Sequence, residues 1–262
     1  MFGKSMARVF VVLSSFVAAA FVLSCTIALA EEDVKIKELK EKLIIANKIL
    51  DLKDLAKPLG HISVRIPGTD TFLITRSVAP GMASLDDIVV CDLNGKVIEG
   101  KYPRSYGEIA AHTGVYKKRK DINSVAHTHS THVIALSMTE TAIVPASINS
   151  FTAGYEPIAI LKKVAFIDNP MIAAEVADLL GPNNAVMLKG HGAVVVGKSL
   201  EECVDNAVAL ENAAQLQVLA SSVAKVVPLT QEQKQPLVDY LTKAAGSGAA
   251  RAWAYYVSLL KK

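Results

Sequence analysis

Cysteine, tryptophan and net charge are all scarce in this sequence. Its 262 residues include three cysteines and one tryptophan, and the formal net charge at pH 7 is only +3. A nearly neutral chain lacks the basic surface of a nucleic-acid-binding protein, and no basic stretch alternates with aromatic residues. There is also no heptad array, no internal repeat and no low-complexity stretch after the first thirty residues. These absences argue against a nucleic-acid-binding protein, a coiled coil and a repeat protein.

The N-terminal segment, residues 1–30, has the pattern of a secretory signal peptide. Two basic residues are followed by an apolar run over residues 9–23, and Ala28-Leu29-Ala30 then precedes an acidic run. We therefore expect cleavage after Ala30, a periplasmic or secreted protein, and no stable membrane span in the mature chain. Two alternatives stay open: an uncleaved N-terminal anchor, and a lipoprotein with Cys25 as the acceptor.

Two cysteines, Cys91 and Cys203, remain once the leader is removed. They could pair in an oxidising compartment. However, Cys91 lies in a strand-like run and Cys203 lies near a helix start more than a hundred residues later. We expect both to be small packed residues, and neither has the spacing of a metal site.

Residues 31–262 predict one α/β domain in which helices cover a sheet. About half of all residues, 51%, are hydrophobic, which allows a sizeable core. Short apolar runs alternate with helical patterns, and Asn94-Gly95 predicts a tight hairpin turn. The expected strands span residues 61–66, 71–75, 87–93, 96–100, 123–129, 185–189 and 193–197. The expected helices span residues 33–56, 106–119, 131–138, 171–180, 200–225, 231–245 and 249–260.

The stretch SVAHTHST, residues 124–131, places two of the six histidines one residue apart. Residues i and i+2 of a strand point to the same face, so His127 and His129 project together, with Cα atoms about 6–7 Å apart. Two imidazoles at that separation can converge on one metal ion. A surface turn can produce the same pattern by chance, so this motif does not decide the matter alone.

A third ligand can come from KGHGAVVVG, residues 189–197. His191 lies between two glycines, which allow a sharp turn and a close approach of the backbone. Three neutral imidazoles suit Zn²⁺ and leave one position open for water or substrate. The plain alternative for His191 is an exposed loop histidine.

Glu108 is the candidate general base, and here two interpretations compete. The run Ser105-Tyr106-Gly107-Glu108 fits a helix capping box, in which the carboxylate would only accept a backbone N–H. Local sequence favours the cap. His112 lies one helical turn later on the same face. Three roles stay open for it: another ligand, a group behind the ligands, or a packed histidine.

Several segments together resemble the class II aldolase/adducin family. The resemblance is carried by EGKYPRSYGEIAAHTGVYKKRKDINSVAHTHSTHVIALS, by LKGHGAVVVGKSLEECVDNAVALE and by LGHISVRI, FLITRS and DDIVVCDLNGKVIEGK, in matching order over about residues 40–225. It implies a fuculose-phosphate-aldolase-like fold: a three-layer α/β/α sandwich around a mixed, largely antiparallel sheet. It also implies a homotetramer.

The resemblance further implies roles for site residues. His127, His129 and His191 would be ligands of one divalent metal, zinc above all, with Mn or Fe as alternatives. Glu108 would be the acid/base residue, which reverses the local preference for a cap, although a cap could still position a base. In this family the metal holds neighbouring substrate oxygens and stabilises an enediolate.

The sequence departs from the sugar-phosphate aldolases of the family at the positions that cradle phosphate. His61, Ser77-Val78 and Tyr106-Gly107 stand where those enzymes have an asparagine, a Thr-Gly pair and a Ser-Ser pair. A phosphate pocket needs several converging donors, whereas an arginine fork such as Arg76 suits a carboxylate. LGHISVR, the TRS run and the GHG loop instead resemble a branch with decarboxylases of hydroxylated aromatic or small keto acids.

We therefore expect a metal-dependent lyase, a decarboxylase or an aldolase, acting on a small non-phosphorylated hydroxy, keto or hydroxyaromatic acid. His61, Arg76 and Ser77 are the candidate substrate-binding residues, although Arg76 could simply form a surface salt bridge. The alternatives are a sugar-phosphate aldolase or epimerase, a non-catalytic scaffold like the adducin head domain, and an Fe²⁺ site for oxygen chemistry.

Overall fold

The computed structural model describes residues 33–244 and 246–261, which divide into two units after Lys40. The described part of the first unit is helical, and the second unit, from Glu41 onward, holds all the elements discussed below. The predicted signal peptide, residues 1–30, lies outside the described residues. Within the described ranges, no helix combines the length and the apolar character needed to cross a membrane.

A single eight-stranded sheet forms the middle layer of the second unit, with the strand order β4-β3-β2-β1-β5-β8-β7-β6. Every neighbouring pair is antiparallel except β6 and β7, which are parallel. The predicted mixed, largely antiparallel sheet is therefore confirmed. The strands are β1 (His61–Arg65), β2 (Thr71–Thr75), β3 (Ile88–Asp92), β4 (Val97–Gly100), β5 (Ser124–Thr128), β6 (Ile160–Leu161), β7 (Ala185–Leu188) and β8 (Gly192–Gly197).

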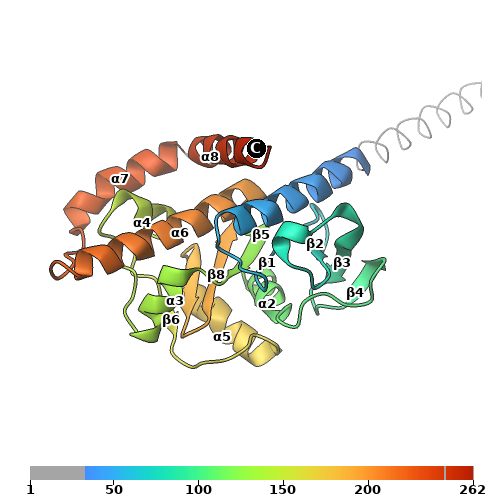
Figure 1. Cartoon of the computed structure of the whole chain (residues 1–262), viewed down its shortest axis with the longest axis horizontal. Helices are drawn as coiled ribbons and strands as arrows, with labels where there is room; N and C mark the ends of the chain where they lie inside the picture. Colours follow the sequence, from blue (N-terminus) through green and yellow to red (C-terminus); the bar gives the residue numbers. More distant parts are fainter. Residues whose placement is uncertain (1–32, 245, 262) are drawn as a thin grey trace, which may run out of the picture. The chain divides into compact units, whose positions relative to one another are not determined.

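Helices cover both faces of this sheet, as expected for an α/β/α sandwich. Figure 1 shows α6 above the sheet and α2 and α5 below it. Helices on both faces explain why all six residues of β8 are buried rather than every second one. The helices are α2 (Ala110–Lys118), α3 (Thr131–Met138), α4 (Ile148–Ala153), α5 (Pro170–Leu180), α6 (Leu200–Ser221), α7 (Gln231–Lys243) and α8 (Ser247–Leu259).

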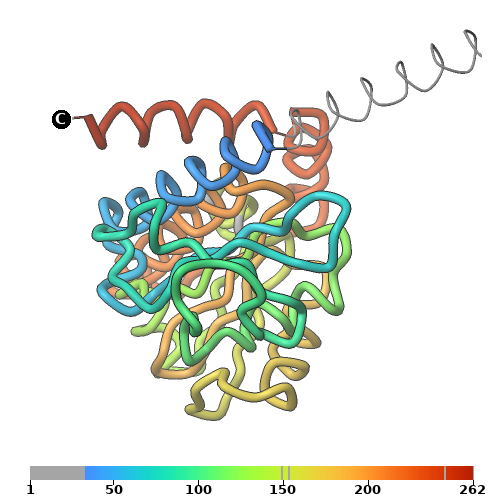
Figure 2. Tube along the Cα trace, turned by 90° about the vertical axis from the view of Figure 1, so that its right-hand side faces the viewer, coloured from blue at the N-terminus to red at the C-terminus, as the bar shows by residue number. Residues whose placement is uncertain are grey.

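Local sequence accounts for the ends of the longer helices. Asn169 accepts the backbone N–H groups of the first turn of α5, and Ser199 and Thr230 do the same for α6 and α7. The predicted turn at Asn94-Gly95 joins β3 to β4, with Gly95 at φ +81°. Figure 2 shows the C-terminal helix α8 outside α6 and next to the helical residues 41–52. Just after these residues, the Lys53 ammonium lies 5.5 Å from the ring centre of Tyr256 in α8.

The predicted helix over residues 106–119 is wrong at its start, because α2 begins only at Ala110. Residues 107–109 form turns instead, and Ser105 donates its hydroxyl hydrogen to Thr75 O rather than capping a helix. Two short elements, α4 and β6, were not predicted. Elements of six and two residues depend on tertiary neighbours more than on their own periodicity.

Cys91 and Cys203 are separate, buried and free. The prediction of two packed small residues is confirmed, and burial raises the pKa of each thiol to about 12.

Candidate metal centre

His127 lies near the end of β5, His129 lies just after the strand, and their rings face each other. His127 is the penultimate residue of the strand, and the backbone N–H of His129 donates to Leu55 O at 2.7 Å. Nδ1 of His127 lies 3.1 Å from Ala193 O. A carbonyl oxygen can only accept, so Nδ1 carries the proton and Nε2 is a bare lone pair. That bare Nε2 lies 2.9 Å from Nε2 of His129.

His191 approaches the same point from the loop between β7 and β8. Its Nδ1 donates to Ala165 O at 3.1 Å, which again leaves Nε2 free to bind. The backbone N–H of Gly190 is held by the Ser137 hydroxyl oxygen at 3.0 Å. A Cβ at Gly192 would lie 1.9 Å from Thr128 O, so only glycine lets this loop reach β5.

Glu108 completes the cluster from the turn before α2. Its Oε1 accepts the Ile167 backbone N–H at 2.7 Å. Its Oε2 lies 3.5 Å from Nε2 of His127 and 3.4 Å from Nε2 of His191. The predicted capping box is not formed. The Glu108 carboxylate faces the three imidazoles instead.

The charge states of Glu108 and His129 favour the binding of a cation. Burial alone would raise the pKa of Glu108, but the imidazoles of His127 and His191 beside the carboxylate hold it well below its ordinary value. The pKa of His129 falls to about 4, because the ring is buried and next to His127 and His191. The nearby Glu108 carboxylate raises the pKa of His191. At neutral pH, Glu108 is ionised and His129 is neutral.

These four residues fit a divalent metal. One ligand atom from each, three imidazole nitrogens and one carboxylate oxygen, lies within 4.8 Å of all the others. Nε2 of His127 and Nε2 of His191 present lone pairs, because Nδ1 of each ring donates to a carbonyl oxygen. Lone pairs that converge this closely require a proton or a cation between them. Imidazole and carboxylate donors suit Zn²⁺, and also Mn²⁺ or Fe²⁺.

His61 lies directly beside the cluster. It pairs with His127 in the register of β1 and β5, and the two ring centres are 5.3 Å apart. The ring of Tyr106 lies 4.1 Å away on centroids, and Nδ1 of His61 is 2.7 Å from Nε2 of His112. Burial, and then neighbouring His112, lower the pKa of His61 well below its ordinary value.

His112, whose role the sequence left open, lies outside the four-residue cluster. It is fully buried, and burial followed by the proximity of His127 lowers its pKa to about 3. It contacts His61 on one side and the Ser63 hydroxyl on the other, both at 2.7 Å. The structure therefore places it behind His61 rather than among the metal ligands.

Arg76 and Ser77 lie after β2 and are tied to a different carboxylate. Arg76 donates from Nε to Asp87 Oδ1 at 2.7 Å and from Nη1 to Ser77 O at 3.3 Å. Its guanidinium carbon also lies 4.7 Å from the ring centre of Tyr102. The salt bridge that was the alternative for Arg76 is thus present, and its role toward substrate stays a prediction.

Tyr106 links this segment to His61. Its hydroxyl donates to Val78 O at 2.8 Å and lies 2.9 Å from Thr75 Oγ1, while its ring packs on His61. His132 bonds through Nδ1 to Glu211 Oε1 at 2.7 Å, away from the cluster, in agreement with a structural role. Lys189, next to His191, pairs with Glu140.

Sequence reasoning missed the groups that orient the ligands. Ala193 O, Ala165 O and the Ile167 N–H belong to the backbone, and no side-chain pattern marks them. It also missed Phe166, whose ring centre is 5.6 Å from that of His191 and which is 70% exposed. Phe166 adds an accessible aromatic surface beside the metal centre.

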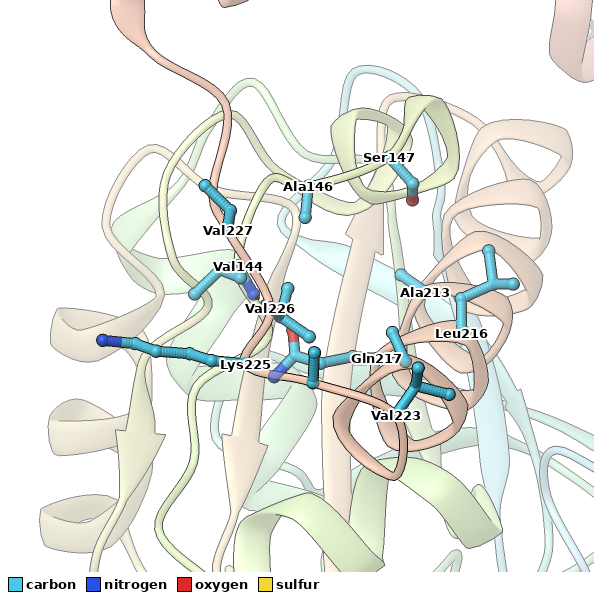
Figure 3. A pocket seen from close by; sticks show the side chains of 12 residues that line it. Val144, Ala146, Ser147, Ala213, Leu216, Gln217, Val223, Lys225, Val226 and Val227 are labelled. Carbon is cyan, nitrogen blue, oxygen red and sulfur yellow. Dashed lines mark hydrogen bonds between the residues drawn. The ribbon is translucent and has the colours of Figure 1, made fainter.

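A separate hollow lies away from these residues. It has a volume of about 560 Å³, and Figure 3 shows that mainly apolar side chains line it, among them Val144, Leu216 and Val223. None of the four cluster residues lines it. We therefore do not identify it with the metal centre.

Comparison with known proteins finds a matching family profile and similar sequences. The sequence profile described as "Class II Aldolase and Adducin N-terminal domain" matches residues 41–218. The chain is 32% identical over 191 residues to the L-fuculose phosphate aldolase of Methanocaldococcus jannaschii, covering 71% of this chain and 98% of the relative. It is 30% identical over 200 residues to the 3,4-dihydroxyphthalate decarboxylase of Arthrobacter keyseri, covering 70% of this chain and 79% of the relative.

A solved structure extends the likeness to the fold. The L-fuculose 1-phosphate aldolase from Glaciozyma antarctica PI12 superposes with a TM-score of 0.75 at 24% identity, over 87% of this chain and 92% of that chain. At this level of identity the match concerns the fold alone.

Proposed function

The chain belongs to the class II aldolase and adducin family, and on that premise we propose that it is a metal-dependent carbon–carbon lyase for a small non-phosphorylated acid. The substrate class is a hydroxy, keto or hydroxyaromatic acid, cleaved by decarboxylation or by an aldolase reaction. The observation that carries the proposal is the convergence of Glu108, His127, His129 and His191 within 4.8 Å. A scaffold would have no need of four converging metal-binding side chains.

His127, His129 and His191 would hold the metal through Nε2. When bound, a divalent metal supplies Lewis-acid stabilisation of the negative charge that develops on a substrate oxygen. Glu108 would move the proton as the carbon–carbon bond breaks or forms. Its Oε1 is fixed by the Ile167 N–H, so Oε2 is the oxygen that exchanges the proton.

The preference for a non-phosphorylated acid rests on Tyr106 and His61 beside the centre and on Arg76 after β2. The Tyr106 hydroxyl is bonded to Val78 O and Thr75, and two nitrogens of Arg76 are engaged by Asp87 and Ser77. These residues leave few small donors for a phosphate, which needs several. His61 and the remaining donors of Arg76 suit one carboxylate, and exposed Phe166 suits an aromatic ring.

A sugar-phosphate substrate is the second candidate, because the relative from Methanocaldococcus jannaschii is named for L-fuculose phosphate. The name of the Arthrobacter relative, a 3,4-dihydroxyphthalate decarboxylase, favours the first candidate. Parallel assays with L-fuculose 1-phosphate and with 3,4-dihydroxyphthalate separate the two. Carbon–carbon cleavage of L-fuculose 1-phosphate at the higher kcat/KM would contradict the preference for a non-phosphorylated acid.

We further propose that the native metal is zinc, that the mature chain is a homotetramer, and that it acts in the periplasm or outside the cell. Zinc follows from the three-imidazole donor set. The tetramer follows from the family resemblance, and light scattering of the mature chain tests it. Export follows from the leader pattern in residues 1–30.

Metal content is the first measurement. Elemental mass spectrometry of residues 31–262 should find about one zinc, manganese or iron per chain in the wild type. The His127→Ala/His129→Ala variant should lose it, and His132→Ala, a histidine outside the cluster, should keep it. No metal in the wild type even after addition of Zn²⁺ or Mn²⁺ would favour the scaffold alternative. Oxygen uptake by an iron-loaded protein with candidate acids would favour oxygen chemistry instead.

A further inference from the structure

The loop that carries His191 is held mainly by backbone hydrogen bonds. The N–H groups of Lys189 and His191 donate to carbonyl oxygens of the neighbouring strands, at 3.1 and 3.0 Å. Gly190, between them, differs, because its N–H donates to the hydroxyl oxygen of Ser137 at 3.0 Å. Within the described part of the chain, Ser137 is the only side chain that accepts a hydrogen bond from the backbone of residues 189–191.

Both hydrogen bonds of the Ser137 hydroxyl have a fixed direction. The amide of Gly190 can only donate, so Ser137 accepts from it. The hydroxyl hydrogen is directed at Ile134 O, 2.7 Å away in the same helix, and a carbonyl oxygen can only accept. Ser137 is fully buried, and alanine would be the better helix former there and would need no partner. The bond to the His191 loop is therefore what the hydroxyl contributes at this position.

The start of α3 directly follows His129 and is fixed by α6. Ser130 is the N-cap residue, but its buried hydroxyl has no partner among the described residues. Glu211 of α6 takes this role, and its two oxygens accept the backbone N–H groups of His132 at 3.1 Å and of Val133 at 3.2 Å. A carboxylate at a helix N-terminus satisfies first-turn donors and is favoured by the helix dipole. Both bonds involve the backbone, so they do not depend on the His132 ring.

Helix α3 thus connects the two segments that carry His129 and His191. It packs on α6, β7 and β8 (Figure 1). Its first residue, Thr131, lies two positions after His129, and Ser137, near its end, holds the residue before His191. The ring centres of the two histidines are 5.2 Å apart. Ligand atoms must lie within about 0.2 Å of their ideal distance from a metal, so a shift of either segment weakens binding.

We propose that α3 holds the segments of His129 and His191 at the separation that a metal ion requires, and that Glu211 and Ser137 are the positioning residues through which it does so. The proposal rests on the proposed function, because the ion is the metal of that site. Neither residue would touch the metal. Each would act through a ligand segment, as groups that orient metal ligands do in other proteins.

Zinc affinity of the folded, metal-free protein, measured by competition with a chelating dye, gives the first test. Ser137→Ala removes the acceptor of the Gly190 N–H, so the Kd for zinc should rise about threefold to tenfold, the range for one intramolecular hydrogen bond. Glu211→Gln cannot accept both backbone N–H groups through oxygen. Its Kd should rise by a similar factor.

Matched controls separate positioning from a general loss of stability. Ser150 is also a buried helical serine, and its hydroxyl donates to Ser147 O at 2.6 Å and accepts the Ser147 N–H at 3.3 Å. Ser150→Ala should therefore lower the free energy of unfolding without changing the Kd for zinc. Glu201→Gln is the control for Glu211→Gln, because Glu201 also belongs to α6 but pairs with Lys42.

Hydrogen exchange of the Gly190 amide in the metal-free protein gives a second readout that needs no zinc. The exchange rate should be about tenfold higher or more in Ser137→Ala, because the amide loses its acceptor, and unchanged in Ser150→Ala.

An unchanged Kd for zinc in Ser137→Ala, or an unchanged exchange rate of the Gly190 amide, would overturn the proposal. If Ser137→Ala does not fold, equal zinc affinity in Glu211→Gln and Glu201→Gln would overturn it instead. A wild type that binds no zinc would refute the proposed function, and the role of α3 toward the metal with it. Normal zinc binding by the wild type and by every variant would refute the role of α3 alone.

Discussion

At the scale of single residues, Glu108 uses its two oxygens differently. Oε1 is held by the Ile167 N–H and Oε2 faces His127 and His191. Replacement by glutamine keeps an oxygen for Ile167 but removes the ionised carboxylate. We therefore expect Glu108→Gln to retain zinc and to lower kcat by about 10²–10⁴-fold, the range for loss of a general acid or base.

The measurement is zinc content and turnover of the same preparation. Glu140→Gln is the matched control, because Glu140 pairs with Lys162 and Lys189 on the surface rather than with the cluster. Undiminished turnover in Glu108→Gln would show that another group moves the proton.

The buried ring of His112 contributes to the pH dependence of stability. Its pKa falls from an ordinary value of 6.5 to about 3 in the folded protein. Between these values the unfolded chain binds more protons at this site, so stability is fully present above pH 6.5 and is lost as the pH falls toward 3. The contribution is about 1.4 kcal/mol per pH unit within that window.

Urea unfolding of the metal-free protein at pH 7, 6 and 5 tests this. His112→Gln should reduce the slope of the unfolding free energy against pH. Parallel pH profiles for the wild type and His112→Gln would mean that His112 is not the group that titrates.

At the scale of elements, the close approach of β8 to β5 depends on one glycine. A methyl group at Gly192 would lie 1.9 Å from O of Thr128, the residue between His127 and His129. Gly192→Ala must therefore push β8 and His191 away from His127 and His129. We expect a loss of at least tenfold in zinc affinity, and a destabilisation of more than about 2 kcal/mol, as for other changes that force strain on a core.

Zinc titration and urea unfolding measure the two effects. Gly248→Ala is the control, since a Cβ there meets no atom within 4 Å and alanine is the better helix former. Equal zinc affinity in Gly192→Ala and in the wild type would show that the loop can hold His191 without this contact.

The elements also show where sequence reasoning holds and where it fails. β5 and β8 were predicted because an apolar run with β-branched residues has few other solutions in an α/β domain. The start of α2 was missed because Ser105 bonds to Thr75 O, a residue thirty positions earlier. His127 and His129 were proposed from their spacing and His191 from its position between two glycines. The carbonyl partners of His127 and His191 could not be predicted, since backbone acceptors carry no sequence signature.

At the scale of the whole molecule, the leader and the mature domain make separate predictions. Cleavage after Ala30 would leave Glu31 as the first residue of the exported chain. N-terminal sequencing of protein from the periplasm and the medium of expressing cells should therefore begin at Glu31. A chain that keeps residues 1–30 and sediments with membranes would instead support the anchor alternative.

The metal should stabilise the whole second unit, because its four candidate ligands come from different parts of the chain. Glu108 precedes α2, His127 lies in β5 with His129 just after it, and His191 lies between β7 and β8. An ion that binds only when these parts are assembled stabilises the folded state by about 2.7 kcal/mol at a free concentration of one hundred times its Kd.

The midpoint temperature of thermal unfolding of the metal-free protein should therefore rise on addition of Zn²⁺. The His127→Ala/His129→Ala variant should show no shift and His132→Ala should shift like the wild type. An equal shift in the double variant would place the stabilising zinc elsewhere, whereas the expected pattern would tie metal binding to the folding of the sheet.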